Sequence, residues 1–355
     1  MKRIILTGGG TAGHVTPNLA LIPELLKGGW EVHYIGTADG MERGLVEGVQ
    51  GVTYHSVASG KLRRYFDWKN FTDPFRVMAG AIQSADLVRK IHPNVVFSKG
   101  GFVSVPVVYG AWMCGVPVVL HESDMTPGLA NRLSAPLAKV LCCTFPEAAK
   151  LAGAKGRYTG TPLRPELFQG NREQGLKLFG FKDDRPVLMV VGGSSGAQAV
   201  NIALRKALPE LLSCFQVLHL CGKGNLDHAF DGTPYYCQKE YLNDDMAHAY
   251  AASDVLVSRA GSNTLCEILA LRKPALLIPY PKTASRGDQI LNAQSFERRG
   301  LARVLMQEEM TPSLLAERLI EVYRDRGSLI DAMEHESSAD GLSNVLRMIY
   351  QYAKK

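Results

Sequence analysis

The chain alternates short apolar runs with segments of helical spacing, and this alternation constrains its fold more than any other feature. The apolar runs are bounded by Gly or polar residues and cover 3–8, 31–36, 95–100, 117–122, 140–145, 187–193, 216–222, 254–259 and 274–280. Such runs are typical of strands that are buried on both faces of a parallel sheet. Because helical segments lie between them, the sequence predicts a doubly wound α/β fold.

The two halves of the chain carry the same arrangement of strand, glycine-rich turn and helix. ILTGGGTAGH starts at residue 5, and VVGGSSGAQAV starts at residue 190. Between them, residues 162–184 are rich in Gly, Pro and charge, which predicts a linker. Since 355 residues exceed what one core usually serves, we predict two Rossmann-like domains facing across a cleft. Their predicted bounds are 1–163 and 164–340, with a helix over 341–355 packing back on the first domain.

Each glycine-rich turn suits a phosphate group. Gly permits positive φ and close approach of a ligand, and the helix beyond it presents unpaired N–H groups and partial positive charge. In the first turn, Gly8, Gly10 and Gly13 match the spacing of a dinucleotide-binding motif. The strand 31–36 does not end in the acidic residue that would bind an NAD ribose, since Asp39 lies beyond it. The dinucleotide interpretation is therefore weak.

The second turn and the helix that starts near residue 262 each allow two interpretations. The hydroxyls of Ser194 and Ser195 either help backbone N–H groups to hold a diphosphate or cap the following helix. Ser262 or Asn263 is the expected cap of the later helix. Glu267 either accepts two hydrogen bonds from a ribose diol or complements the helix dipole.

A polar loop follows the strand 274–280 and ends in three side chains that suit a sugar. Asp288, Gln289 and Asn292 offer hydrogen-bonding groups of the kind that hydroxyl-rich ligands need. Helix capping by Asp288 is the alternative.

Composition narrows the cellular setting but does not name a partner. The net charge of +6 allows an anionic partner without specifying one. The seven Cys include no CxxC pair, and the adjacent Cys142 and Cys143 stand in an apolar run, which predicts buried free thiols in a reducing cytosol. No stretch approaches the length of a membrane span, and the apolar run at the start is too short for a signal peptide.

The motifs of the chain, taken together, resemble one enzyme family. They are GGGTAGHVTP, SKGGFVSVP, VVLHESDMTPGLANR, TGTPLRPE, VVGGSSGAQAVN, NDDMAHAYAASDVLVSRAG, GSNTLCEI and DQILNA, in this order along nearly the whole chain. The chain resembles the MurG family, which comprises GT-B glycosyltransferases of family 28. The resemblance implies transfer of GlcNAc from UDP-GlcNAc to the 4-hydroxyl of MurNAc in undecaprenyl-diphospho-MurNAc-pentapeptide (lipid I), which forms lipid II with inversion. It implies no cofactor and no bound metal, and the chain has no convincing DxD loop.

The resemblance also implies which residues bind the donor. The resemblance implies that Ser194 contacts the diphosphate, Glu267 contacts the ribose and Gln289 contacts the GlcNAc hydroxyls. It also implies that the backbone of Asn243 contacts uracil. The other matching donor residues are Thr11, Ala12, Gly13, Asp124, Arg164, Ser262, Asn263 and Thr264. Two of these depart from the family motif, because Ala12 stands where Gly is usual and Asp124 stands where Asn is usual.

The acceptor is expected at the first glycine-rich turn and at the SKGGFVSVP loop. The expected acceptor residues are Gly10, His14, Gly101, Phe102 and Ser104. The reaction needs a base for the acceptor hydroxyl, and an imidazole titrates near neutrality, so His14 is the first candidate. Glu122 is the second candidate, with His121 packing behind its strand. In a metal-free site, the N–H groups and helix dipole of the second turn would stabilise the departing UDP.

A basic and aromatic stretch over 61–80 suits the surface of a membrane. KLRRYFDWKNFTDPFRVMAG interleaves Lys and Arg with Tyr, Phe and Trp, as in helices that lie on an anionic leaflet. An ordinary core helix with one solvated face is the alternative. We therefore expect the cytoplasmic side of the cell membrane as a peripheral location, with lipid I as a partner, no nucleic acid, and scope for contacts with other cell-wall synthesis proteins.

Three other functions remain as alternatives. A UDP-GlcNAc 2-epimerase of the same fold would keep the donor pocket and need no lipid acceptor. A transferase acting on another lipid would share most of the motifs. A non-catalytic nucleotide-sugar binding subunit would tolerate the loss of both candidate bases.

Overall fold

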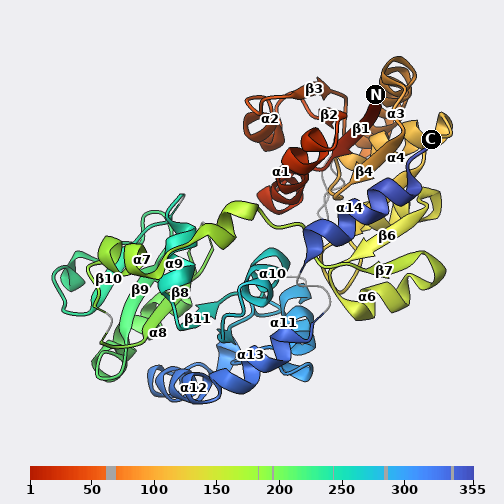
Figure 1. Cartoon of the computed structure of the whole chain (residues 1–355). Coiled ribbons are helices and arrows are strands. Elements are labelled where there is room, and N and C mark those ends of the chain that lie inside the picture. Colours follow the sequence, from red (N-terminus) through yellow and green to blue (C-terminus); the bar gives the residue numbers. More distant parts are fainter. Residues whose placement is uncertain (61–68, 183, 194–195, 243, 284–286, 337–339) are drawn as a thin grey trace. The chain divides into compact units, whose positions relative to one another are not determined.

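The computed structural model describes residues 1–355 except 61–68, 183, 194–195, 243, 284–286 and 337–339, and except the side chains of 69–72 (Figure 1). The chain divides into two compact units. The first contains Met1–Arg164 together with Asp340–Lys355, and the second contains Pro165–Ala339. Each unit is built on a parallel sheet of its own.

The first unit has a seven-stranded sheet in the order β3-β2-β1-β4-β5-β6-β7, in which every neighbouring pair is parallel. The strands are β1 (Lys2–Thr7), β2 (Trp30–Gly36), β3 (Val52–Ser56), β4 (Val95–Ser98), β5 (Val118–Glu122), β6 (Val140–Cys143) and β7 (Gly156–Tyr158). The helices are α1 (Ala12–Lys27), α2 (Met41–Val46), α3 (Lys69–Ile91), α4 (Ser104–Met113), α5 (Leu129–Ser134), α6 (Pro146–Leu151) and α14 (Gly341–Tyr352), with short turns η1 (Ala135–Leu137) and η2 (Gly153–Lys155).

The second unit repeats this order with six parallel strands, β10-β9-β8-β11-β12-β13. The strands are β8 (Val187–Val191), β9 (Gln216–Leu220), β10 (Tyr236–Lys239), β11 (Val255–Ser258), β12 (Ala275–Leu277) and β13 (Arg303–Val304). The helices are α7 (Arg172–Phe179), α8 (Gln198–Leu211), α9 (Met246–Ala252), α10 (Ser262–Ala270), α11 (Asp288–Arg298), α12 (Pro312–Arg324) and α13 (Arg326–Glu334), with turns η3 (Pro165–Gln169), η4 (His228–Phe230) and η5 (Gln307–Glu309).

Strand order reverses between β1 and β4 in the first sheet and between β8 and β11 in the second. Helices after β1 and β4 leave the sheet in opposite directions at such a point, so a crevice opens beyond the carboxyl ends of the strands. Both glycine-rich turns lie there, because they follow β1 and β8. The topology therefore places each turn where ligands of doubly wound sheets bind.

The predicted doubly wound α/β fold is confirmed in both units, and every predicted apolar run contains a strand. Four strands were not predicted, namely β3, β7, β10 and β13, and all four are edge strands. An edge strand has a neighbour on one side only, and these four include polar or partly exposed positions instead of a continuous apolar run.

The predicted linker is largely a folded part of the second unit. Residues 162–184 include η3 and α7, and the side chain of Asn171 caps α7 by accepting from the Gln174 N–H. A Cβ on Gly175 would lie 2.3 Å from the carbonyl oxygen of His248 in α9. This approach shows that α7 packs closely on α9, so the Gly and charge content of the stretch reflects helix packing as well as exposure.

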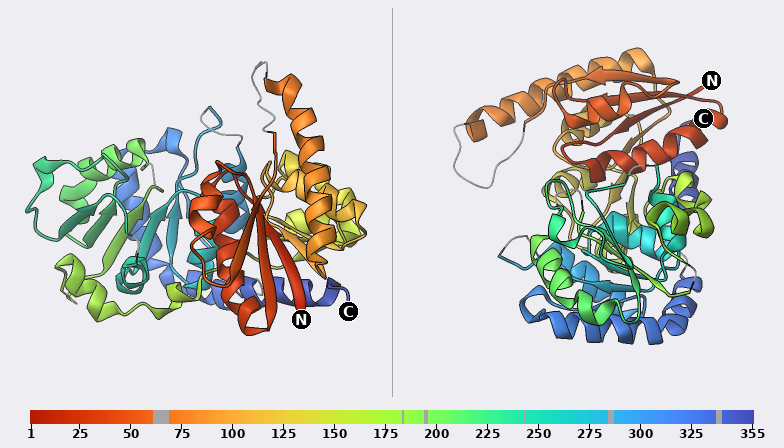
Figure 2. Two further views of the ribbon diagram at one scale, coloured as in Figure 1. Left: turned by 90° about the horizontal axis from the view of Figure 1, so that it is seen from above. Right: turned by 90° about the vertical axis from the view of Figure 1, so that its left-hand side faces the viewer.

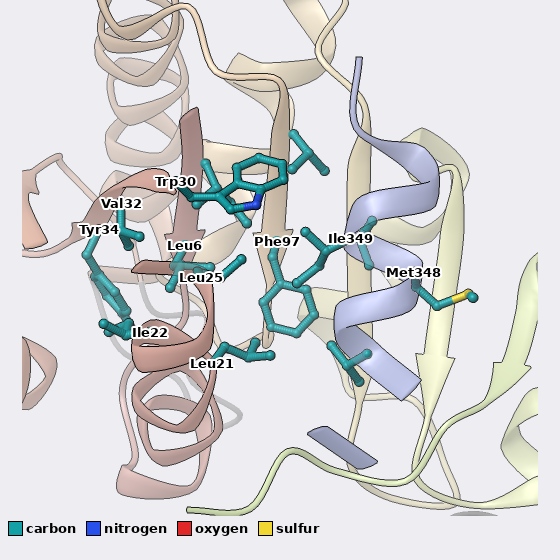
Figure 3. Close-up of a cluster of buried hydrophobic side chains, with 14 of the residues drawn as sticks. Leu6, Leu21, Ile22, Leu25, Trp30, Val32, Tyr34, Phe97, Met348 and Ile349 are labelled. Atoms are coloured by element: carbon teal, nitrogen blue, oxygen red, sulfur yellow. The ribbon is translucent and has the colours of Figure 1, made fainter. Parts of the chain in front are cut away.

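Helix α14 packs on the core of the first unit (Figure 3). Val345 and Ile349 are fully buried in the same cluster as Phe97 of β4, while Leu342 and Leu346 pack against it. These positions recur at helical spacing and form one apolar face. The ring of Tyr350 meets the edge of Trp30 with centroids 5.4 Å apart. The end of the chain is thus an integral part of the first sheet's cover.

The adjacent cysteines were predicted as buried thiols, and this is confirmed. Cys142 and Cys143 are both fully buried in β6. Burial raises the pKa of each thiol to about 12, so neither is reactive at neutral pH.

Candidate active site

The first glycine-rich turn connects β1 to an exposed helix N-terminus. Thr11 is the N-cap of α1 in extended conformation, and its side chain makes no capping hydrogen bond. Thr11 and Ala12 are exposed, whereas Gly13 and His14 are half-buried. The His14 N–H donates to the Thr11 carbonyl oxygen at 3.1 Å, and the first residues of α1, Thr11 and Ala12, are open to solvent at a helix N-terminus, where anions bind.

The loop after β4 packs directly against this turn. The Lys99 N–H donates to the carbonyl oxygen of Thr7 at 2.9 Å, which joins the two loops side by side. A Cβ on Gly101 would lie 2.3 Å from the Gly9 carbonyl oxygen, and a Cβ on Gly10 would lie 2.5 Å from the Phe102 ring. Both glycines also have φ near +80°. Gly10 and Gly101 therefore carry no side chain because the loop after β4 lies directly against the first turn, where a Cβ would collide.

The structure gives the other expected acceptor residues different environments. Phe102 is half-buried and covers Gly10. Ser104 is 1% exposed, and its hydroxyl donates to the Gly101 carbonyl oxygen at 2.8 Å. The Ser104 hydroxyl thus stabilises the loop that contains Gly101 and is buried in this conformation.

Glu122 is buried at the end of β5 and organises the loop that follows. Its carboxylate accepts from the N–H groups of Asp124 and Gly128, both at 3.1 Å, and from the Asn131 amide at 2.9 Å. Burial raises the pKa of Glu122, while these donors oppose the rise. Asp124 is half-buried beside it. Three donors already bind this carboxylate, which favours a role in holding the loop 123–128.

His121 is also a residue of β5, and its side chain is buried in the first unit. Its Nε2 donates to the Gly160 carbonyl oxygen at 2.8 Å, and the side chain is fully buried. Burial lowers the pKa of His121 well below its usual range, so the ring is neutral.

Two charged residues at this edge were not identified from the sequence. Lys99 is 1% exposed at the end of β4, where it donates to the hydroxyl of Ser123. Glu42 in α2 is fully buried and reaches the first glycine-rich turn, where its Oε2 accepts from the Gly10 N–H at 3.3 Å. Gly10 was expected to contact the acceptor, but its N–H already serves Glu42. The SKGGF motif already places Lys99 beside the loop after β4. Glu42 lies 32 residues from Gly10 along the chain, and no sequence motif links it to the turn.

The second unit contains a pocket of about 250 Å³ at the carboxyl ends of its central strands. Its lining comes from the second glycine-rich turn, the loop after β11, the first turn of α10 and the segment between β12 and α11. The lining residues are Val191, Gly192, Gly193, Ser258, Arg259, Gly261, Thr264, Tyr280 and Gln289. Thr264 and Gln289, both expected in the donor site, therefore meet in one pocket.

The remaining expected donor residues lie around this pocket or elsewhere. Ser262 and Asn263 form the first turn of α10 with Thr264, but the helix cap is Gly261, so the predicted cap was wrong. Arg164 is exposed at the last position of the first unit's main segment. Ser194 and Asn243 lie outside the described residues. Asp288 is the first residue of α11, and the N-cap is Gly287.

Glu267 and Gln289 are each oriented by a hydrogen bond to a tyrosine. The buried Tyr250 hydroxyl donates to Glu267 Oε2 at 2.7 Å. Gln289 Oε1 accepts from the Tyr280 N–H at 3.1 Å. Glu267 lies in the second turn of α10, further from the helix start than the sequence suggested. Its distance from the terminus weakens the dipole explanation, since that effect fades beyond the first turn.

Arg259 is a buried cation in the pocket wall that sequence reasoning missed. Its Nη1 donates to the carbonyl oxygens of Ile278 and Pro279, and its Nη2 donates to Gln307 at 2.7 Å. The guanidinium stacks over the Tyr280 ring at 4.1 Å. Burial lowers the pKa of Arg259, but an arginine stays charged in a protein. The pocket therefore has a positive wall, which suits an anionic ligand.

Comparison with known proteins identifies the family of this chain. Residues 4–142 match the N-terminal domain of glycosyltransferase family 28, and residues 187–346 match its C-terminal domain. A relative from Clostridium tetani is 51% identical over 99% of this chain and 98% of its own. The chain belongs to glycosyltransferase family 28. That relative is named UDP-N-acetylglucosamine--N-acetylmuramyl-(pentapeptide) pyrophosphoryl-undecaprenol N-acetylglucosamine transferase.

Solved structures agree with this family 28 assignment. The crystal structure of Acinetobacter baumannii MurG has a TM-score of 0.79 at 25% identity and covers 99% of this chain and 100% of its own. A putative UDP-N-acetylglucosamine 2-epimerase from Listeria monocytogenes has a TM-score of 0.72 at 12% identity, covering 99% of this chain and 97% of its own. The second likeness concerns the fold alone. The fold by itself thus accommodates both a transferase and an epimerase.

Proposed function

We propose that this family 28 protein transfers GlcNAc from UDP-GlcNAc to the 4-hydroxyl of MurNAc in lipid I, forming lipid II with inversion. The observation that carries the proposal is the 51% identity, over almost the whole chain, to a transferase named for this donor and acceptor. The pocket of the second unit supports it, because residues expected to bind the donor line it together. No cofactor enters the proposed reaction.

The proposed donor site uses the polar groups of the second unit. The N–H groups of the second turn and the N-terminus of α8 bind the diphosphate and stabilise the charge that develops on UDP. Arg259 adds a fixed positive charge to the wall. Glu267, held by Tyr250, binds the ribose, and Gln289 binds the sugar hydroxyls. These roles need no metal.

The proposed acceptor site uses the first glycine-rich turn and the loop after β4. His14 takes the proton of the attacking hydroxyl, while the exposed N-terminus of α1 binds the acceptor diphosphate. Glu122 is the alternative base. Its three bound donors argue for His14, because a base that abstracts a proton must lose or rearrange such contacts.

The test is transfer in the absence of free metal. Purified protein is incubated with radiolabelled UDP-GlcNAc, a short-chain lipid I analogue and EDTA. Labelled disaccharide product is expected. UDP-GlcNAc binding without product would contradict the proposal, and conversion of UDP-GlcNAc to its 2-epimer without an acceptor would favour the epimerase alternative.

We also propose that the protein acts at the membrane surface through α3. The predicted membrane stretch falls partly on 61–68, outside the described residues. The described part of α3 carries an exposed apolar stripe, with Phe75, Met78 and Ile82 exposed by 68%, 56% and 65%. Arg76 is exposed beside them. Both views in Figure 2 show the N-terminal part of α3 projecting beyond the sheet of the first unit. No helix among the described residues is long and apolar enough to cross a bilayer.

Replacing this stripe with serine should release the protein from vesicles. We expect the triple variant Phe75→Ser, Met78→Ser, Ile82→Ser to bind phosphatidylglycerol vesicles at least about tenfold more weakly in sedimentation, since each apolar side chain contributes on the order of 1 kcal/mol when buried. Transfer to a water-soluble acceptor analogue should stay unchanged within about twofold.

The control replaces exposed apolar residues of other helices. Leu151→Ser with Ile202→Ser removes side chains exposed by 74% and 49%, and it should leave vesicle binding unchanged. Equal losses in the α3 variant and this control would refute the proposed membrane surface.

A further inference from the structure

Glu42 is a buried carboxylate that has no charged partner among the residues the structure describes. Its Oε1 accepts from the N–H and the hydroxyl of Thr37, at 3.0 and 2.6 Å. Its Oε2 accepts from the Gly10 N–H. An apolar side chain here would leave the Thr37 and Gly10 donors without this acceptor, so Glu42 ties the loop after β2 to the first glycine-rich turn.

The backbone around Glu42 is shaped to admit its carboxylate. A Cβ on Gly9 would lie 2.6 Å from Glu42 Oε2, and a Cβ on Gly40 would lie 2.0 Å from Oε1. Gly36 is also in contact, since its Cβ would lie 2.9 Å from Glu42 Cγ. Glycines thus line the approach of Glu42 to the first glycine-rich turn.

The peptide between Gly9 and Gly10 separates Glu42 from His14. In a trans peptide the N–H and the C=O point in opposite directions, and the described backbone contains no cis bond. The Gly10 N–H faces Glu42, while the Gly9 carbonyl oxygen lies 3.2 Å from His14 Nδ1. One rigid peptide therefore connects a carboxylate on one side with an imidazole on the other.

Two contacts of Nδ1 bear on the tautomer of His14. A carbonyl oxygen only accepts, so a hydrogen bond to Gly9 needs a proton on Nδ1, whereas the Thr11 hydroxyl, 3.0 Å from Nδ1, can either accept that proton or donate to an unprotonated nitrogen. The Nδ1–H tautomer is the one in which both contacts are hydrogen bonds. In this neutral tautomer the lone pair is on Nε2. Because linked hydrogen bonds polarise one another, the carboxylate makes the Gly9 carbonyl a stronger acceptor.

We propose that Glu42 is a positioning residue that acts on His14 through the Gly9–Gly10 peptide and holds the imidazole as the Nδ1–H tautomer. The inference rests on the proposed function, in which His14 is the base. Nε2 takes the proton of the acceptor hydroxyl as its oxygen bonds to the sugar C1. The bond from C1 to the UDP oxygen breaks, and UDP leaves with its electron pair. The resulting imidazolium keeps its Nδ1–H on the polarised carbonyl.

Kinetics of Glu42→Gln test the proposal. The amide cannot accept at both ends, so either Gly10 or Thr37 loses an acceptor. We expect kcat to fall about tenfold while the KM for UDP-GlcNAc changes less than about twofold. In the background of His14→Ala, the same change should lower kcat less than about twofold, because coupled residues are non-additive. An equal loss in both backgrounds would overturn the proposal.

A buried residue of the same helix provides the control. Val46 is fully buried in α2 and packs in the apolar cluster of the first unit. Val46→Ala should destabilise the protein while leaving kcat within about twofold of the parent. A tenfold fall in kcat for this variant would assign the effect to loosening of α2 and overturn the role of Glu42.

Nitrogen NMR measures the tautomer of His14 directly in the parent protein. Histidine ¹⁵N shifts of the whole chain, assigned with His14→Gln, should report Nδ1–H for His14, and Glu42→Gln should lower that population. An Nε2–H tautomer in the parent protein would overturn the proposal. Failure of the transfer assay would refute the proposed function, whereas the tautomer decides the positioning role separately.

Discussion

Gly101→Ala is expected to lower kcat/KM for transfer by at least about 100-fold, because a shift of about 1 Å in a reacting group can cost that much. The new Cβ would lie 2.3 Å from the Gly9 carbonyl oxygen and 3.1 Å from His14 Nδ1. Neither neighbour is a flexible chain end, so the turn that carries His14 must move. Donor binding should change less than about twofold, since the described residues that line the pocket of the second unit all belong to that unit.

The matched control is Gly29→Ala. Gly29 also has positive φ, +75° against +83° for Gly101, but nothing lies within 4 Å of its Cβ position. Gly29→Ala therefore introduces only the backbone strain of positive φ, about 1–2 kcal/mol, without the collision that Gly101→Ala adds. We expect a lower melting temperature with near-normal transfer, measured by calorimetry and the radiolabel assay. Similar activity in both variants would show that the contact between the two loops does not position His14.

Arg259→Lys should produce the largest effect in the second unit. Lysine keeps the charge but cannot reproduce the fork that donates to Ile278, Pro279 and Gln307, nor the stacking on Tyr280. Buried acceptors would lose their donors, which should lower the free energy of unfolding by about 3 kcal/mol. Because the pocket wall formed by Arg259 and Tyr280 would shift, the KM for UDP-GlcNAc should rise at least about tenfold. Denaturant titration and initial rates measure the two effects.

Arg318→Lys is the control for this substitution. Arg318 is about half exposed and pairs with Glu321 on α12, and surface pairs of this kind contribute about 0–1 kcal/mol. Both stability and KM should remain near the parent values. If Arg259→Lys lowers stability but leaves the KM for UDP-GlcNAc unchanged, Arg259 supports the fold and has no part in donor binding.

Motifs contiguous in sequence identified much of the candidate site. The glycine-rich turns, His14, Thr264 and Gln289 follow strands that could be predicted, so their place at the carboxyl edge followed from the parallel order. Glu42, Lys99 and Arg259 could not be assigned in this way. Charged residues are normally solvated, and only the folded chain shows that these three are buried.

The sequence alone determined the central strands and both glycine-rich turns, because a strand buried on both faces must be apolar throughout and a turn with positive φ favours glycine. The tertiary structure decided what such local patterns do not encode. It placed β3, β7, β10 and β13 at the edges, ordered α7 within the expected linker and brought Glu42 to Gly10. These features depend on contacts between residues distant in sequence, whose energies exist only once the chain has folded.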